Sequence, residues 1–155
     1  MIKLGIPGKG TFVFEHIVLD FNGTLGYDGN LIFGVRERLN LLVDNLKIHI
    51  LTADTFESCQ SSCHGMDAHI HILSSTGGPA KEKYVLDLGP QRVIAIGNGN
   101  NDALMLARAA LGVAVLGPEG LSILAMQAAD IVVRDITSAL DLLINPKRII
   151  ATLRE

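Results

Sequence analysis

The sequence contains little cysteine and no long apolar run. Only Cys59 and Cys63 occur among its 155 residues, so a framework of disulfide bonds is not expected. No apolar segment approaches the roughly 20 residues that a membrane-spanning helix needs. Lys3 and Lys9 are not followed by the continuous apolar stretch of a secretory signal peptide. We therefore expect a soluble, cytoplasmic protein that does not bind to a membrane.

The sequence also lacks an excess of charge of one sign. Its net charge is -3 and its pI is about 5.9, which gives no electrostatic reason to expect nucleic acid or an anionic membrane as a partner. Hydrophobic residues make up 48% of the chain and charged residues 19%, a balance typical of a compact globular protein. A chain of this length suits one domain, which we expect to span residues 1–155.

Short segments rich in Ile and Val alternate with helical segments from about residue 16 onward. Strands are predicted at 12–19, 47–52, 69–73, 92–97, 113–117 and 131–135. Helices are predicted at 35–46, 56–65, 79–89, 101–112 and 119–128, and from 136 onward. Turn signals at 8–10 and 28–29 predict short strands and a small hairpin. The alternation predicts an α/β fold, a three-layer Rossmann-like parallel sheet with helices on both faces.

Polar residues follow the predicted strands at three places. Asp20 ends the first strand of the alternating region, Thr52 ends the next, and residues 98–102 follow the strand at 92–97. Lys81 and Lys83 open the helix that leads to this last strand. The carboxyl ends of parallel strands lie at one edge of a sheet, where ligands of such folds bind. We therefore expect these side chains to converge on one crevice.

These residue types suit phosphoryl transfer. A carboxylate such as Asp20 can attack phosphorus and form an aspartyl-phosphate. The transferred group spreads negative charge over its oxygens, so a lysine, a threonine hydroxyl and backbone amides near Asn22-Gly23 are fitting partners. Magnesium prefers oxygen ligands, which Asp20, Asp102 and a backbone carbonyl can offer.

The segment DFNGTL at 20–25 resembles the opening motif of the haloacid dehalogenase superfamily, D-x-D-G-T-L. Thr52 in HILTAD, Lys81 in PAKEKYVLDLG and GNGNND at 97–102 are similar to the second, third and fourth motifs. Each motif alone is weak, but four in order are a specific signal. The segments IGNGNNDALMLARAALGVAV and EGLSILAMQAADIVV also look like the phosphorylation domain of P-type ATPases.

With no membrane helix and no room for a nucleotide-binding domain, the chain resembles the small soluble P-type ATPase-like branch. The segments between the motifs are short, so we expect no cap domain. Capless relatives often oligomerise, which makes a homo-oligomer one of the arrangements that the resemblance implies.

The resemblance implies a role for each matching residue. Asp20 would be the nucleophile, and the implied catalytic residues are Asp20, Asn22, Thr52 and Lys81. The implied phosphate-binding residues are Phe21, Asn22, Gly23, Thr52, Ala53 and Lys81. The implied magnesium-binding residues are Asp20, Asn22, Asn98 and Asp102. Lys83 is a rival to Lys81, which we prefer because Val85 and Leu88 then follow at the superfamily's helical spacing.

Two residues depart from the superfamily pattern. Asn22 stands where phosphatases of the superfamily carry an acid/base aspartate, and an amide cannot transfer protons; losing such a group costs ~10²–10⁴-fold in rate. P-type ATPases also lack an acid there. Asn98 stands where the superfamily has a metal-binding aspartate, and its neutral amide should bind magnesium more weakly. Both changes favour a slow enzyme.

Two functions therefore remain open. The first is a magnesium-dependent phosphatase-like hydrolase that forms a phospho-aspartate at Asp20, acting on a small phosphorylated substrate or a phosphorylated macromolecule. The second is a phosphate-binding or regulatory module that barely turns over. Each residue also has an ordinary structural explanation: Asp20 as a strand-end turn residue, Thr52 as a strand residue, Lys81 as a solvated lysine, and Asp102 as a helix N-terminal carboxylate.

The stretch CQSSCHGMDAHIH at 59–71 invites a zinc hypothesis. Cys59 and Cys63 lie four apart, with His64, His69 and His71 nearby. Structural zinc sites pair two similarly spaced couples of ligands, and that pattern is missing here. We favour buried thiols and histidines at a sheet edge.

Overall fold

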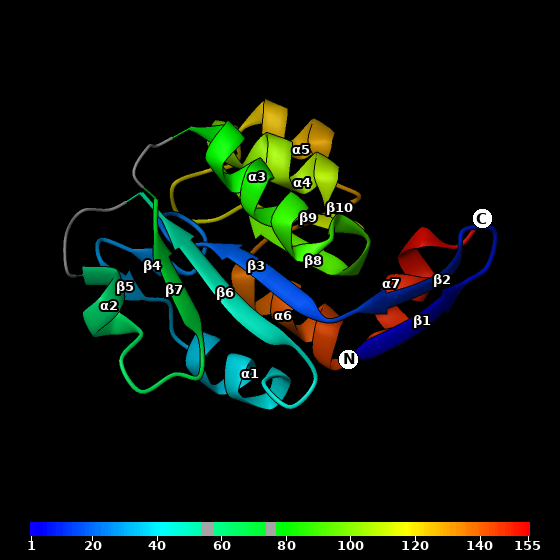
Figure 1. Cartoon of the computed structure of the whole chain (residues 1–155), viewed down its shortest axis with the longest axis horizontal. Helices are drawn as coiled ribbons and strands as arrows, with labels where there is room; N and C mark the ends of the chain where they lie inside the picture. The colour runs from blue at the N-terminus through cyan, green and yellow to red at the C-terminus, as the bar shows by residue number, and fades with distance from the viewer. Residues whose placement is uncertain (54–57, 74–76) are drawn as a thin grey trace.

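The computed structural model describes residues 1–53, 58–73 and 77–155. In these residues, a 6-stranded sheet runs in the order β10-β9-β8-β3-β6-β7 (Figure 1). Its strands are β3 (His16–Asp20), β6 (Lys47–Thr52), β7 (His69–Ile72), β8 (Val93–Gly97), β9 (Leu111–Val115) and β10 (Ile131–Val133). All neighbouring strands pair in parallel, which confirms the predicted α/β fold.

Helices cover both faces of this sheet (Figure 1). One face packs against α1 (Val35–Leu42) and α6 (Ile136–Ile144), and the other against α3 (Gly78–Leu88), α4 (Ala103–Arg108) and α5 (Ile123–Ala128). The remaining strands and α-helices are β1 (Ile2–Ile6), β2 (Gly10–Phe14), β4 (Gly26–Tyr27), β5 (Asn30–Leu31), α2 (Ser58–Ser62) and α7 (Lys147–Leu153). Two short 3-10 helices, η1 (Pro90–Arg92) and η2 (Asn100–Asp102), precede and follow β8. The hairpin of β1 and β2 extends beyond the sheet, next to α7.

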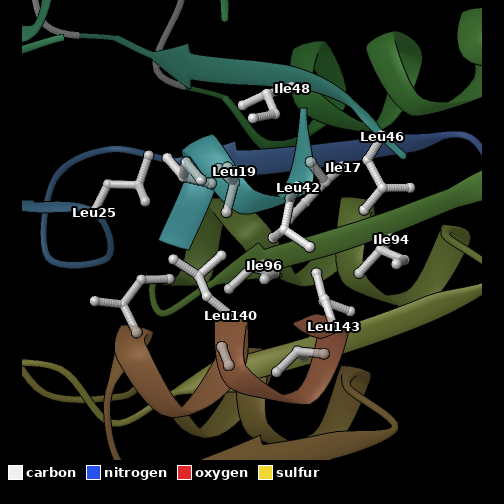
Figure 2. Close-up of a cluster of buried hydrophobic side chains, with 14 of the residues drawn as sticks. Ile17, Leu19, Leu25, Leu42, Leu46, Ile48, Ile94, Ile96, Leu140 and Leu143 are labelled. Atoms are coloured by element: carbon white, nitrogen blue, oxygen red, sulfur yellow. The ribbon is translucent and has the colours of Figure 1, made fainter. Parts of the chain in front are cut away.

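Alternate residues of β3 enter two different cores. Ile17 and Leu19 point toward α1 and α6, whereas Val18 belongs to the core beneath α3, α4 and α5. Figure 2 shows the first of these cores, where Leu140 and Leu143 of α6 face the sheet. Because both faces of the strand are buried, its sequence is a continuous run of apolar residues. A carboxylate fits only where that run leaves the sheet, at its carboxyl end.

Most predicted elements are confirmed. The strand predicted at 12–19 is wrong as a single strand, because it is divided between β2 and β3, which belong to different sheets. The helix predicted at 101–112 ends at Arg108, before β9 begins at Leu111. The strand at 47–52 and the hairpins around residues 8–10 and 28–29 form as predicted. Helix α1 ends at Leu42 rather than at residue 46, because the next residues turn back, with the Asn45 amide donating to the Leu42 carbonyl at 2.9 Å. Helix α5 begins at Ile123 rather than at 119, since the Ser122 hydroxyl caps it. Of the helix predicted at 56–65, residues 56–57 lie outside the described ranges.

The connections between the strands are small. Between β3 and α1 the chain forms only the short hairpin of β4 and β5, and the described residues between β6 and α3 form only α2 and β7. This agrees with the expected lack of a cap domain. Among the described residues, no helix has the length and apolar character to cross a bilayer.

Candidate active site

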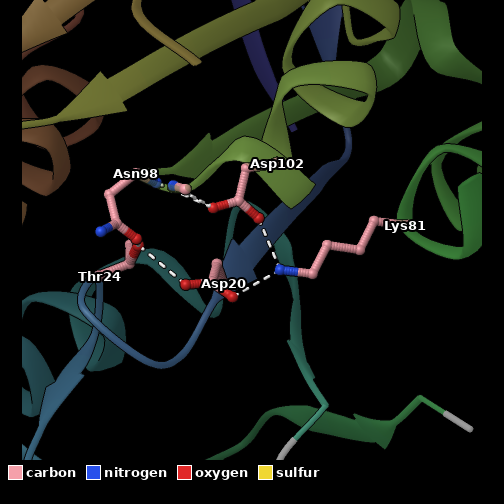
Figure 3. A network of polar contacts seen from close by, with 6 residues as sticks. Asp20, Thr24, Lys81, Asn98 and Asp102 are labelled. Carbon is pink, nitrogen blue, oxygen red and sulfur yellow. Dashed lines mark hydrogen bonds and ion pairs between the residues drawn. The ribbon is translucent and has the colours of Figure 1, made fainter. Parts of the chain in front are cut away.

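Three chain segments meet at the carboxyl end of β3. Asp20 is the last residue of β3, Lys81 comes from α3, and Asn98 and Asp102 follow β8 (Figure 3). The Lys81 Nζ atom lies 2.6 Å from Asp20 Oδ1 and 2.6 Å from Asp102 Oδ1. The three groups are buried, with Lys81 only 1% exposed. The convergence expected from the strand ends therefore exists for these residues.

Helix α3 explains why one lysine enters the site and the other does not. Lys81 and Val85 are separated by one helical turn and are both buried. Lys83 points to the opposite side, where its side chain is 73% exposed and pairs with Asp87 at 2.7 Å. The structure thus places Lys81, and not Lys83, beside Asp20.

The turn after β8 is organised by Asp102. Its Oδ2 atom accepts hydrogen bonds from the backbone amides of Asn98 at 2.9 Å and Gly99 at 2.8 Å, while Oδ1 accepts from Lys81. A Cβ on Gly97 would lie 2.5 Å from Asp102 Cγ, so only glycine leaves room for this carboxylate. Both Asp102 oxygens therefore accept hydrogen bonds, which hold the turn after β8 and the Lys81 ammonium group in place.

Thr24 joins Asp20 to Asn98. Its hydroxyl oxygen lies 3.1 Å from Asp20 Oδ2 and 3.0 Å from Asn98 Oδ1, but a hydroxyl has one proton and can donate to only one of them. The Asn98 amide is oriented by its nitrogen, which donates to the Gly120 carbonyl at 3.0 Å. Two oxygens therefore converge with one proton between them. A cation with oxygen ligands fits this arrangement.

The charges of the buried groups also favour a cation. Burial raises the pKa of Asp20 to about 7, the charge of Asp102 adds to this rise, and Lys81 opposes it. Burial lowers the pKa of Lys81, but the two carboxylates outweigh it and hold that pKa above its usual value. Two carboxylates thus share a single ammonium group. A bound cation would offset the second negative charge.

The other predicted site residues lie at the same edge of the sheet. Thr52 ends β6 directly after Leu51, which is the register partner of Asp20, and Ala53 follows it. Asn22 is exposed, and Gly23 adopts a positive φ of 76° in the turn. The Phe21 ring lies in the core, so only the backbone of that residue can face the site.

Sequence reasoning missed two parts of this site. Thr24 is part of the motif DFNGTL, so the sequence could have indicated it as a site residue. The loop at 116–122 overlaps the segment EGLSILAMQAADIVV, but that resemblance assigned no role to Gly120, whose carbonyl accepts from the Asn98 side chain.

The residues of the zinc hypothesis are separated by the sheet. Cys59 and Cys63 are buried in the core beneath α1 and α6. His71 lies on the other face, where it contacts Tyr84 of α3, whose hydroxyl also lies 2.9 Å from His49 Nδ1. Among the described residues, no three or more His, Cys, Asp or Glu side chains are arranged to hold a metal. The favoured interpretation of buried thiols and edge histidines agrees with this geometry.

Known proteins show where this chain belongs. A sequence model for haloacid dehalogenase-like hydrolases matches residues 81–129, which include Lys81, Asn98 and Asp102. Uncharacterized protein MJ0073 of Methanocaldococcus jannaschii is 52% identical over 65 residues, 42% of this chain and 70% of that protein. The chain belongs to the haloacid dehalogenase superfamily.

Solved structures of this superfamily share the fold. A putative 3-deoxy-D-manno-octulosonate 8-phosphate phosphatase from Vibrio cholerae superposes with a TM-score of 0.72 at 15% identity, covering 94% of this chain and 96% of that one. The 3-deoxy-D-manno-octulosonate 8-phosphate phosphatase from Moraxella catarrhalis, solved with magnesium ion, phosphate ion and its KDO molecule, gives 0.65 at 18% identity, with coverages of 91% and 94%. At these identities the likeness establishes the haloacid dehalogenase fold for almost the whole chain.

Proposed function

We propose that the chain is a magnesium-dependent phosphatase that acts through a phospho-aspartate at Asp20 and turns over slowly. The observation that carries this proposal is the 2.6 Å contact between Asp20 Oδ1 and the buried Lys81 Nζ at the carboxyl end of β3. A carboxylate held there beside a cation can meet a phosphoryl group, whose negative charge the ammonium group offsets. The open site, without a cap among the described residues, suits a small phosphorylated substrate or a phosphorylated macromolecule.

The reaction would proceed in two displacements. One Asp20 oxygen attacks phosphorus, the ester P–O bond breaks, and the leaving alcohol takes its proton from solvent. Water then attacks the phospho-aspartate, releasing inorganic phosphate and restoring the carboxylate. Lys81, the Thr52 hydroxyl and the backbone amides of residues 21, 22 and 53 would hold the phosphoryl oxygens in both steps. The predicted part of the Gly23 amide is corrected by the turn itself, because this amide donates to the Gly26 carbonyl at 2.9 Å.

Magnesium would be held by Asp20 Oδ2, Asn98 Oδ1 and the Asn22 backbone carbonyl, a set of oxygen donors of the kind it prefers. When bound, it would supply positive charge to the nucleophile and the phosphoryl group. Asp102 belongs to the predicted metal set as well. Because its two oxygens accept from Lys81 and from backbone amides, we expect it to act by positioning these groups.

Slow turnover follows from Asn22. Its amide can neither protonate the leaving group nor deprotonate water, a loss of ~10²–10⁴-fold. This feature, the P-type ATPase-like segments and the small connections support placing the chain in the soluble, capless P-type ATPase-like branch. The cytoplasmic location and a homo-oligomeric state stay predictions.

The test is hydrolysis of p-nitrophenyl phosphate with magnesium. Wild type should release p-nitrophenol, and Asp20→Asn should abolish the release because an amide cannot attack phosphorus. Asp87→Asn is the matched control, since Asp87 is exposed on α3 and pairs with Lys83. A rate in Asp20→Asn equal to that of the control would refute the proposal.

The second candidate is a phosphate-binding or regulatory module, which the neutral Asn22 and Asn98 favour. A module of this kind would bind beryllofluoride at Asp20 with magnesium but release no p-nitrophenol. Calorimetric titration with beryllofluoride, alongside the hydrolysis assay, separates the two functions.

A further inference from the structure

The loop between β9 and α5, residues 116–122, lies directly against the turn that follows Asp20. A Cβ on Gly117 would approach the Gly23 carbonyl oxygen to 2.3 Å, so the two backbones are in contact and glycine is needed there. The loop closes on itself through the Gly120 amide, which donates to the Gly117 carbonyl at 2.9 Å. The segment is therefore a fixed wall of the site.

Asn98 holds this loop at two further points. Its side-chain nitrogen donates to the Gly120 carbonyl at 3.0 Å, and its backbone carbonyl accepts from the Ser122 amide at 2.8 Å. Figure 3 shows the Asn98 amide oxygen directed toward Thr24 and the nitrogen directed away from it. The amide thus presents its oxygen to the proposed metal position and its nitrogen to the loop.

Glu119 stands in the middle of this loop. Its Oε2 atom lies 2.7 Å from the place that a Cβ on Gly23 would occupy, and Asn98 Nδ2 lies 2.7 Å from the same place. The Glu119 side chain is exposed, and its carboxylate lies near the nitrogen of the Asn98 amide. No lysine, arginine or histidine of the described ranges forms an ion pair with it.

We infer that Glu119 supplies the negative charge that Asn98 lacks at the metal position. Asn98 offers magnesium a neutral oxygen, and Asp20 shares its charge with Lys81. A carboxylate behind the amide attracts the cation through space. Glu119, in a different loop and outside the four motifs, thereby replaces the negative charge that an aspartate at position 98 would provide. The inference rests on the metal site of the proposed function.

The test is binding of magnesium ion alone, measured by isothermal titration of the full chain without substrate. Glu119→Gln should weaken the affinity about three- to tenfold, the range for one charge near a divalent ion in partly solvated surroundings. Glu119→Asp keeps the charge and should retain most of the affinity. Glu37→Gln, an identical change at an exposed position of α1, should bind as wild type does.

Thermal melts without metal accompany the titration. Equal melting temperatures of wild type and Glu119→Gln, together with weaker binding, support the charge role. The inference is overturned by unchanged affinity in Glu119→Gln, by a wild type that does not bind magnesium, or by a metal-free melting temperature that falls enough to account for the weaker binding. A wild type that binds magnesium but hydrolyses no ester refutes the proposed phosphatase while leaving the role of Glu119 intact.

Discussion

Replacing Lys81 by methionine tests the buried charge cluster most directly. Lys81 Nζ contacts Asp20 and Asp102 at 2.6 Å each, and the lysine is 1% exposed. Methionine fills a similar volume but leaves the two carboxylates without their cation. Removing one partner of a buried ion pair costs about 3–5 kcal/mol. For a chain of this length, that loss lowers the Tm by roughly 10 °C.

The measurement is urea unfolding at pH 7.5 without magnesium, with Lys83→Met as the control. Lys83 lies two residues away on the same helix, but its side chain is 73% exposed. Its pair with Asp87 is worth at most about 1 kcal/mol, so the control should unfold close to wild type. The two variants remove the same charge, and only the burial differs.

A second variant identifies the cause of the loss. Lys81→Met/Asp20→Asn leaves Asp102 as the only carboxylate of the cluster, and its Oδ2 still accepts from two backbone amides. The double variant should therefore recover part of the lost stability. The reasoning is refuted if Lys81→Met unfolds at the same urea concentration as Lys83→Met, or if the double variant is less stable than Lys81→Met.

Three further predictions follow from the geometry. Asn22→Asp should raise the kcat for an activated ester ~10²-fold or more; an unchanged kcat argues against the missing-acid explanation. Gly97→Ala should cost about 1–3 kcal/mol in urea unfolding, because the new Cβ would lie 2.5 Å from Asp102 Cγ; wild-type stability would contradict this packing. Burial, reinforced by neighbouring imidazoles, lowers the pKa of His49 to about 4. The unfolded chain binds this proton near pH 6.5, so stability should fall as the pH drops from 6.5 toward 4, by on the order of 1–2 kcal/mol at pH 5. Melts at pH 7.5 and 5 should differ less for His49→Gln.

The fold was largely predictable because its signals are local. The buried strands of the sheet are apolar on both faces, and a residue such as Asp20 marks where a strand leaves the core. One error occurred where a nonlocal contact overrides the local pattern. The helix predicted from 119 starts at Ile123, because residues 117–120 are held against the Gly23 turn and Asn98.

The candidate site was predictable in part. The four motifs pointed to residues that the sheet does bring together, but they did not say how these residues contact each other. The proximity of Asp102 to Lys81, and the single Thr24 hydroxyl between two oxygens, depend on distances that only the folded chain sets. Glu119 lies outside the four motifs, and the P-type ATPase-like segment that begins with it assigned it no role.

By itself, the sequence determined the order of strands and helices and the placing of a carboxylate at the end of a buried strand, because these follow from hydrophobic patterns within a few residues. Only the tertiary structure decided which lysine reaches that carboxylate, what Asp102 holds, and which loop closes over Asn98. Asp20 and Lys81 are 61 positions apart, and Thr24 and Asn98 are 74 apart. Contacts over such separations exist only because β8 pairs beside β3 in the centre of the sheet and aligns the carboxyl ends of the two strands.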